Sequence, residues 1–179
     1  MRKHHRTLLA AVAVTAIAGV AYATSPHFIT ATDAIGTAAD VDDLVVSWKE
    51  AGLGNNQLIN YTASADGTAT YGCINGGGNH PSASNKETVS GPVTASGTFN
   101  SGMNGQITAS LIAEEPGPGS FTCPNGQSFV LASVSYTNVV LRDTTNGITE
   151  PLNNQSMTFC DFDTLTKTTV KNCVAVPDE

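Results

Sequence analysis

The chain has 179 residues and a formal net charge of −7, with 40% hydrophobic and 13% charged residues. This length supports one hydrophobic core, and the hydrophobic content differs from that of disordered chains. The acidic balance argues against nucleic-acid binding, because phosphates require clustered Lys and Arg side chains. We therefore expect a single globular domain.

The first 23 residues have the three-part pattern of a signal peptide. Basic residues occupy positions 2–6, an apolar run covers residues 8–23, and the tripeptide Ala-Tyr-Ala at 21–23 is a small-x-small cleavage site. The apolar run is shorter than the ~20 residues that span a bilayer, and no basic cluster follows it. We predict a secreted, extracellular protein that begins at Thr24 and has no membrane span after cleavage.

Export makes the four cysteines candidates for disulfide bonds, because compartments outside the cytoplasm oxidise thiols. Four cysteines allow three connectivities, and the residues alone do not choose among them. Chain order suggests Cys73–Cys123 and Cys160–Cys173. A zinc site needs closely spaced ligands such as C-x-x-C, which these cysteines lack, so we expect no metal and no cofactor.

After the signal peptide, residues 24–41 lack steady periodicity and predict a loosely structured N-terminal segment with room for one short strand. Residues 42–179 form a series of β-rich runs separated by turn residues, which predicts one domain. The clearest run is 88–99, where apolar or small residues alternate with Ser and Thr. Pro92 inside this run predicts an edge strand or a bulge, since proline cannot donate to a ladder.

Turn residues arrange the other runs into expected pairs. A turn at 100–105 would join 88–99 to the next strand as a hairpin, and Asp66-Gly67 would join two strands of a second hairpin. Asn146-Gly147 would turn a long strand toward Ile148. The remaining expected strands are 44–48, 58–63, 68–74, 107–111, 129–141 and a last pair, 156–161 with 168–174.

These eight or nine strands, without a helix, predict an all-β fold: an antiparallel β-sandwich whose topology, immunoglobulin-like or jelly-roll-like, stays open. An immunoglobulin domain places a tryptophan between two bridged cysteines, whereas Trp48 precedes all four cysteines here. The alternation also predicts which side chains face inward. They are Val89, Val93, Phe99, Ile107 and Leu111.

Two long loops break the strand rhythm and are the candidate binding surfaces, because binding usually resides in loops on a rigid scaffold. One loop, 75–85, is glycine-rich and follows Cys73, and the other, 114–120, precedes Cys123. Trp48 is added as an aromatic residue near a turn. The candidate binding residues are Trp48, Asn75, Asn79, His80, Glu114 and Glu115.

Catalytic signatures are weak. His80 lies close to two serines, but no G-x-S-x-G elbow is present. The glycines at 76–78 lack the Lys-Ser/Thr of a P-loop. The carboxylate pairs at 42–43, 114–115 and 161/163 could serve a glycosidase or a calcium ion. However, adjacent strand residues point to opposite faces, and no D-x-D-x-D-G loop follows. We expect no catalytic residues and no enzyme activity.

Three stretches carry a resemblance: VSWKEAGLGNNQLINYTASADGTATYGCINGGGNHP, NKETVSGPVTASGTFNSGMNGQITASL and PGPGSFTCPNGQSFVLASVSYTNV. Together they resemble a group of small, secreted, single-domain proteins of actinomycete bacteria with no assigned function. The similarity covers residues 46–145 and implies secretion without catalytic residues. It also favours Cys73–Cys123 within the shared region and Cys160–Cys173 within the tail.

Three functions are compatible with these features. The first is a secreted, non-catalytic protein that binds an unknown extracellular or cell-surface partner through its rim loops. The second is an inert structural or envelope-associated protein. The third is an extracellular hydrolase with an unrecognised site. An exposed apolar or aromatic patch near Trp48 or the loops would favour the first over the second.

Overall fold

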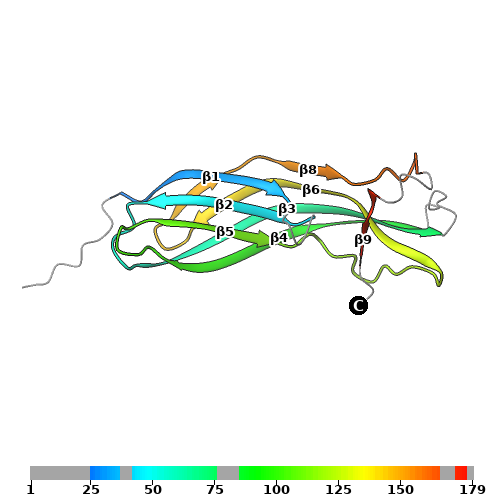
Figure 1. The fold of residues 1–179 in the computed structure, drawn as a ribbon, viewed down its shortest axis with the longest axis horizontal. Coiled ribbons are helices and arrows are strands. Elements are labelled where there is room, and N and C mark those ends of the chain that lie inside the picture. Colours follow the sequence, from blue (N-terminus) through cyan, green and yellow to red (C-terminus); the bar gives the residue numbers. More distant parts are fainter. Residues whose placement is uncertain (1–24, 37–41, 76–84, 166–171, 177–179) are drawn as a thin grey trace, which may run out of the picture.

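The computed structural model describes residues 25–36, 42–75, 85–165 and 172–176. Within these ranges the chain forms nine strands in two antiparallel sheets that pack against each other (Figure 1). The predicted β-sandwich is confirmed. The predicted signal peptide and two candidate residues, Asn79 and His80, lie outside the described residues.

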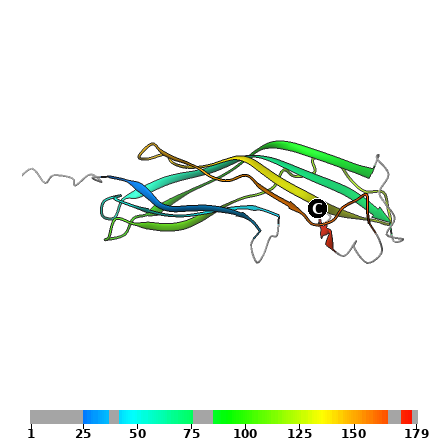
Figure 2. The same cartoon turned by 90° about the horizontal axis from the view of Figure 1, so that it is seen from above.

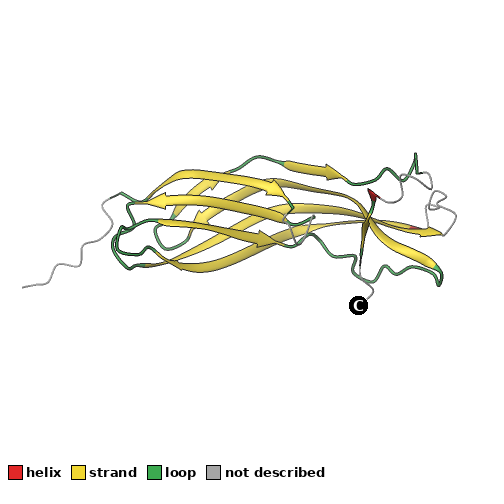
Figure 3. Cartoon of the chain, viewed as in Figure 1, coloured by secondary structure: helices red, strands yellow, loops and turns green. Residues whose placement is uncertain are grey.

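The smaller sheet has the order β1-β2-β5, and the larger has the order β4-β3-β6-β7, with β8 and β9 also paired to β6. Strands and loops make up the described chain almost entirely (Figure 3). The described residues include no helix that is long and apolar enough to cross a membrane. The strands are β1 (His27–Ile35), β2 (Leu44–Ala51), β3 (Leu58–Asn75), β4 (Lys86–Asn100), β5 (Ile107–Ala113), β6 (Gln127–Asp143), β7 (Ile148–Pro151), β8 (Gln155–Thr158) and β9 (Val174–Ala175).

Alternation along the strands builds the core between the sheets. Of the five side chains predicted to face inward, three are buried and two, Val89 and Phe99, are half-buried against the core. Trp48 packs on Tyr61 and Phe99, with ring centroids 4.6 and 5.4 Å away. Pro92 lies on β4, which pairs with β3 alone, so the edge position predicted from proline is confirmed.

The expected hairpin at Asp66-Gly67 is wrong, because β3 runs unbroken through both residues. Gly67 is extended here, and its glycine serves close packing: a methyl group on it would come within 2.8 Å of the Pro116 ring. A glycine in the sequence can therefore indicate either a turn or a place where another part of the chain packs closely. A single 18-residue strand therefore replaces the two shorter strands.

The expected hairpin of 88–99 with the next strand is also wrong. The turn at 101–106 connects β4 to β5 across the sandwich, since β4 pairs with β3 and β5 pairs with β2. The expected pair of 156–161 with 168–174 lies partly outside the described residues; in the part that is described, β8 and β9 each pair with β6. A turn between two strands therefore does not determine that the two strands pair with each other.

The N-terminal segment contributes more order than we expected from its sequence. Residues 27–35 form β1, an edge strand that pairs with β2. A bulge between Phe28 and Thr30 shifts the register and interrupts the period of two. The strand therefore has no steady alternation that would reveal it in the sequence.

The larger sheet extends beyond the end of the smaller one (Figures 1 and 2). We call this overhang the far end. It comprises the C-terminal residues of β3 and the N-terminal residues of β6. On the inner face it is covered by the β5–β6 loop (residues 114–126), which Cys123 bonds to Cys73. On the outer face it is covered by the C-terminal tail (residues 159–165), where Phe162 lies against Gly72. Cys160 and Cys173 are also bonded, so both suggested disulfides are confirmed.

Candidate functional site

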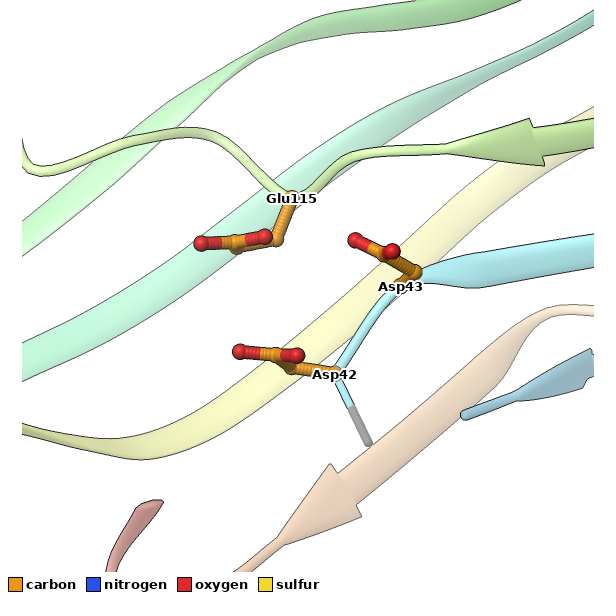
Figure 4. Close-up of side chains that lie close together, drawn as sticks. All are labelled: Asp42, Asp43 and Glu115. Carbon is orange, nitrogen blue, oxygen red and sulfur yellow. The ribbon is translucent and has the colours of Figure 1, made fainter. Parts of the chain in front are cut away.

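Three carboxylate groups lie together where the smaller sheet ends and the far end begins (Figure 4). We call Asp42, Asp43 and Glu115 the acidic cluster. Each residue contributes a carboxylate oxygen, and these oxygens lie within 4.8 Å of one another. Asp43 is buried, while Asp42 and Glu115 are half-buried.

The register of the smaller sheet assembles this cluster. Leu44 of β2 pairs with Ala113 of β5, so the chain entering β2 lies beside the chain leaving β5. The two carboxylate pairs noted in the sequence, 42–43 and 114–115, are thereby brought to one place. Glu114 is exposed, and Glu115 alone joins the two aspartates.

Two buried tyrosines of the larger sheet lie beneath the cluster. The Tyr71 hydroxyl donates to Glu115 Oε1 at 3.1 Å and to the Pro116 carbonyl at 2.8 Å. The Tyr136 hydroxyl donates to the Asp42 carbonyl at 2.7 Å. Burial, followed by the charge of Glu115, raises the pKa of both hydroxyls well above the ordinary value. Both tyrosines therefore stay neutral hydrogen-bond donors.

The cluster has the donor type that hard cations prefer, since all three ligands are carboxylates. Calcium takes six to eight oxygens, whereas three residues supply ligands here, and two tyrosine hydroxyls already hydrogen-bond this site. Within the described ranges, the acidic cluster is the group of side chains placed closely enough to hold a metal ion together. Its geometry alone assigns it no metal.

The β5–β6 loop that follows Glu115 is held in one shape by several contacts. The amide of Phe121 donates to the Pro118 carbonyl and that of Gln127 to the Pro124 carbonyl, which closes two turns. Gly119 and Gly126 adopt φ values of +62° and +81° in these turns, a conformation that favours glycine. The Phe121 ring packs on Phe129 at a centroid distance of 5.8 Å. With the disulfide at Cys123, these contacts fix the loop on the larger sheet.

The other predicted binding residues fall in separate places. Asn75 is exposed at the end of β3, opposite Gln127 of β6. The predicted role of Trp48 as a surface ring is wrong, because Trp48 is 2% exposed in the middle of β2. Its position follows from alternation with Leu44 and Val46, which also face inward.

Asp161 and Asp163, considered as a calcium pair, have structural partners in the tail. Asp161 accepts hydrogen bonds from the Asp163 amide and the Thr164 hydroxyl, which caps a turn. Asp163 forms an ion pair with Lys86 at 3.0 Å, and its side chain is highly exposed. The two carboxylates therefore serve different contacts.

The outer face of the smaller sheet carries a shallow groove of about 520 Å³. Its polar residues come from all three strands, in two rows that follow the strand register. The rows are Thr30, Lys49 and Thr108, and Thr32, Ser47 and Ser110. The groove is an open surface rather than an enclosed site.

Comparisons with protein-family models, with curated proteins and with solved structures find no match to this chain.

Proposed function

We propose that this chain is a secreted, non-catalytic protein that binds an extracellular or cell-surface partner through the β5–β6 loop. The observation that carries the proposal is that this long loop is attached to the larger sheet at several points along its length. The Tyr71–Pro116 hydrogen bond, the Phe121–Phe129 contact and the Cys73–Cys123 disulfide all restrain it. A preorganised loop loses less conformational entropy on binding, which favours affinity.

Gly117 gives a second reason to place the partner on this loop. A methyl group on Gly117 would meet no atom within 4 Å, and its φ lies outside the left-handed region. The fold therefore does not require glycine at this position. Gly117 and the nearby Ser120 are both exposed, so a partner can approach the backbone closely here.

Secretion is supported by the signal-peptide pattern and by two disulfides, which are typical of oxidising compartments. We expect the exported protein to begin at Thr24. Intact-mass measurement of the protein from culture medium tests this expectation. A mature product that still carries residues 8–18 would contradict it.

Binding is tested with the tagged, exported protein, incubated with washed cell envelope and with medium from the secreting culture. The loop variant is Gly117→Leu, and the matched control is Met103→Ala, an exposed residue in the β4–β5 turn at the opposite end. We expect both variants to melt like the wild type. Retention on the envelope or on a medium component should fall at least tenfold for Gly117→Leu alone.

Two outcomes would count against this function. Equal retention of the wild type and Gly117→Leu would exclude the loop as the binding surface. Retention of neither protein, with both folded, would favour an inert structural role without envelope association.

A further inference from the structure

Three polar side chains lie close together in the interior at the end opposite the far end, because the Tyr61 hydroxyl bonds Glu50 and Tyr61 pairs with Asp143 in the sheet. Glu50 belongs to β2 of the smaller sheet, while Tyr61 of β3 and Asp143 of β6 belong to the larger. Glu50 and Asp143 are 0% exposed, and Tyr61 is 1% exposed. Two acidic groups are therefore buried together between the sheets, where an unpaired charge is costly.

Asp143 is the member of the pair that is satisfied as a carboxylate. Its Oδ1 accepts hydrogen bonds from the amides of Thr145 and Asn146 at 2.8 and 2.9 Å. Its Oδ2 accepts one from the Asn146 side-chain amide at 2.6 Å. Both carboxylate oxygens of Asp143 therefore have hydrogen-bond donors. They also cap the turn that leads into β7.

Glu50 lacks such a set of donors. Its Oε2 accepts the Tyr61 hydroxyl at 2.6 Å, whereas its Oε1 is buried and has no hydrogen-bond partner. The pKa of Glu50 is raised to about 7. Burial is the largest cause, and the negative charge of Asp143 contributes to the same rise. The Tyr61 hydrogen bond and the charge of His27 on β1 act in the opposite direction. These are the titratable groups that face Glu50 from the elements packed around it.

We propose that Glu50, which Tyr61 joins to the larger sheet beside Asp143, carries a proton in the folded protein, and that removing this proton loosens this end of the sandwich. With the proton present, one negative charge lies in the interior and Oε1 carries a hydrogen that can be donated. Without the proton, two negative charges face each other in a medium that screens them poorly. The proton leaves to solvent, and no other group changes.

The pair makes folding pH-dependent in a defined direction. The pKa of Glu50 is higher in the folded protein than the ordinary 4.5, so the folded state binds the proton more tightly than the unfolded state. The resulting stability is fully present below about pH 4.5, falls as pH rises toward 7, and is absent above that. The folding equilibrium constant should fall on the order of 100-fold across this window.

Trp48 supplies the measurement, because it is the one tryptophan in the chain and its ring lies 4.6 Å from that of Tyr61. We expect Trp48 fluorescence of the folded protein to titrate with a midpoint near pH 7. Glu50→Gln, which keeps the shape and adds no charge, should abolish this transition. It should also melt above the wild type at pH 8 and close to it at pH 4.5. Glu87→Gln, at an exposed position of β4, is the matched control and should titrate like the wild type.

Two more variants separate this pair from a merely structural contact. Asp143→Asn removes the neighbouring charge and should lower the midpoint, whereas Tyr61→Phe removes a donor and should raise it. A wild-type protein with no fluorescence transition between pH 5 and 9 would overturn the proposal. So would a transition that persists unchanged in Glu50→Gln.

Discussion

The end of the molecule around Trp48 and the far end around Tyr71 bury the same long strands in different ways. Around Trp48, β3 and β6 are covered on their inner face by a second sheet, and three aromatic rings fill the space. At the far end both faces are covered, the inner one by the β5–β6 loop and the outer one by the C-terminal tail. Within the described residues, neither covering contributes a strand to the smaller sheet.

The positions of the disulfides follow from this difference. Cys73–Cys123 attaches the inner covering, and Cys160–Cys173 closes the tail that provides the outer one. A strand forms backbone hydrogen bonds to its neighbours along its length, whereas an irregular segment is attached at a few points only. The comparison teaches that this fold uses covalent links where regular β-structure stops.

The largest expected effect comes from breaking the sheet-on-sheet end. Trp48→Ala should lower the free energy of unfolding by roughly 4–5 kcal/mol, because it removes a fully buried ring and leaves a cavity. Urea unfolding followed by far-ultraviolet circular dichroism measures this loss. Phe121→Ala, which removes a half-buried ring of the β5–β6 loop, is the far-end counterpart and should lose less than half as much. Equal losses would contradict the difference between the two ends.

The next effect concerns the covalent links. Opening the 50-residue span between Cys73 and Cys123 should cost about 4 kcal/mol in the chain-entropy model, and opening the 13-residue span between Cys160 and Cys173 about 3 kcal/mol. Melting of Cys73→Ser and Cys160→Ser variants compares the two. Since a domain of this size has ~5–15 kcal/mol in total, both Tm values should fall by many degrees. Equal losses would undercut the dependence on loop length.

The sequence predicted most of the fold wherever a period of two was complete. The alternation between Val89 and Leu111 correctly predicted the inward-facing side chains of two strands, and Pro92 correctly predicted an edge strand. Asp66-Gly67 misled because one glycine can signal either a turn or close packing, and only the position of Pro116 distinguishes them. The pairing partners of β4, β8 and β9 depend on contacts far apart in the chain, which local turn residues do not encode.

The candidate site was harder to predict from the sequence than the fold. Glu115 was a candidate, but its approach to Asp42 and Asp43 depends on the register between β2 and β5. Glu50 had a usable signal, because the inward alternation that places Trp48 continues two residues further to Glu50. The predicted strand 44–48 stops short of Glu50, and a fully buried glutamate is rare in a core.

The smallest effect tests whether the tail is packed as closely as a sheet would be. Gly72 and Gly91 are both extended strand glycines outside the left-handed region, so alanine fits the backbone at either position. A methyl group on Gly72 would overlap the Phe162 ring, whereas one on Gly91 would meet no atom within 4 Å. Gly72→Ala should therefore destabilise by roughly 1–3 kcal/mol through overpacking, and Gly91→Ala should stabilise by about 0.4–1 kcal/mol by restricting the unfolded chain.

Thermal melting of the two variants gives the comparison directly. The double variant Gly72→Ala/Phe162→Leu makes room for the new methyl group and should lose less stability than the two single losses added together. Additive losses, or a Gly72→Ala variant as stable as Gly91→Ala, would mean that the tail does not pack on the outer face. A loss confined to Gly72→Ala would show that seven residues of irregular chain cover this strand tightly enough to exclude one methyl group.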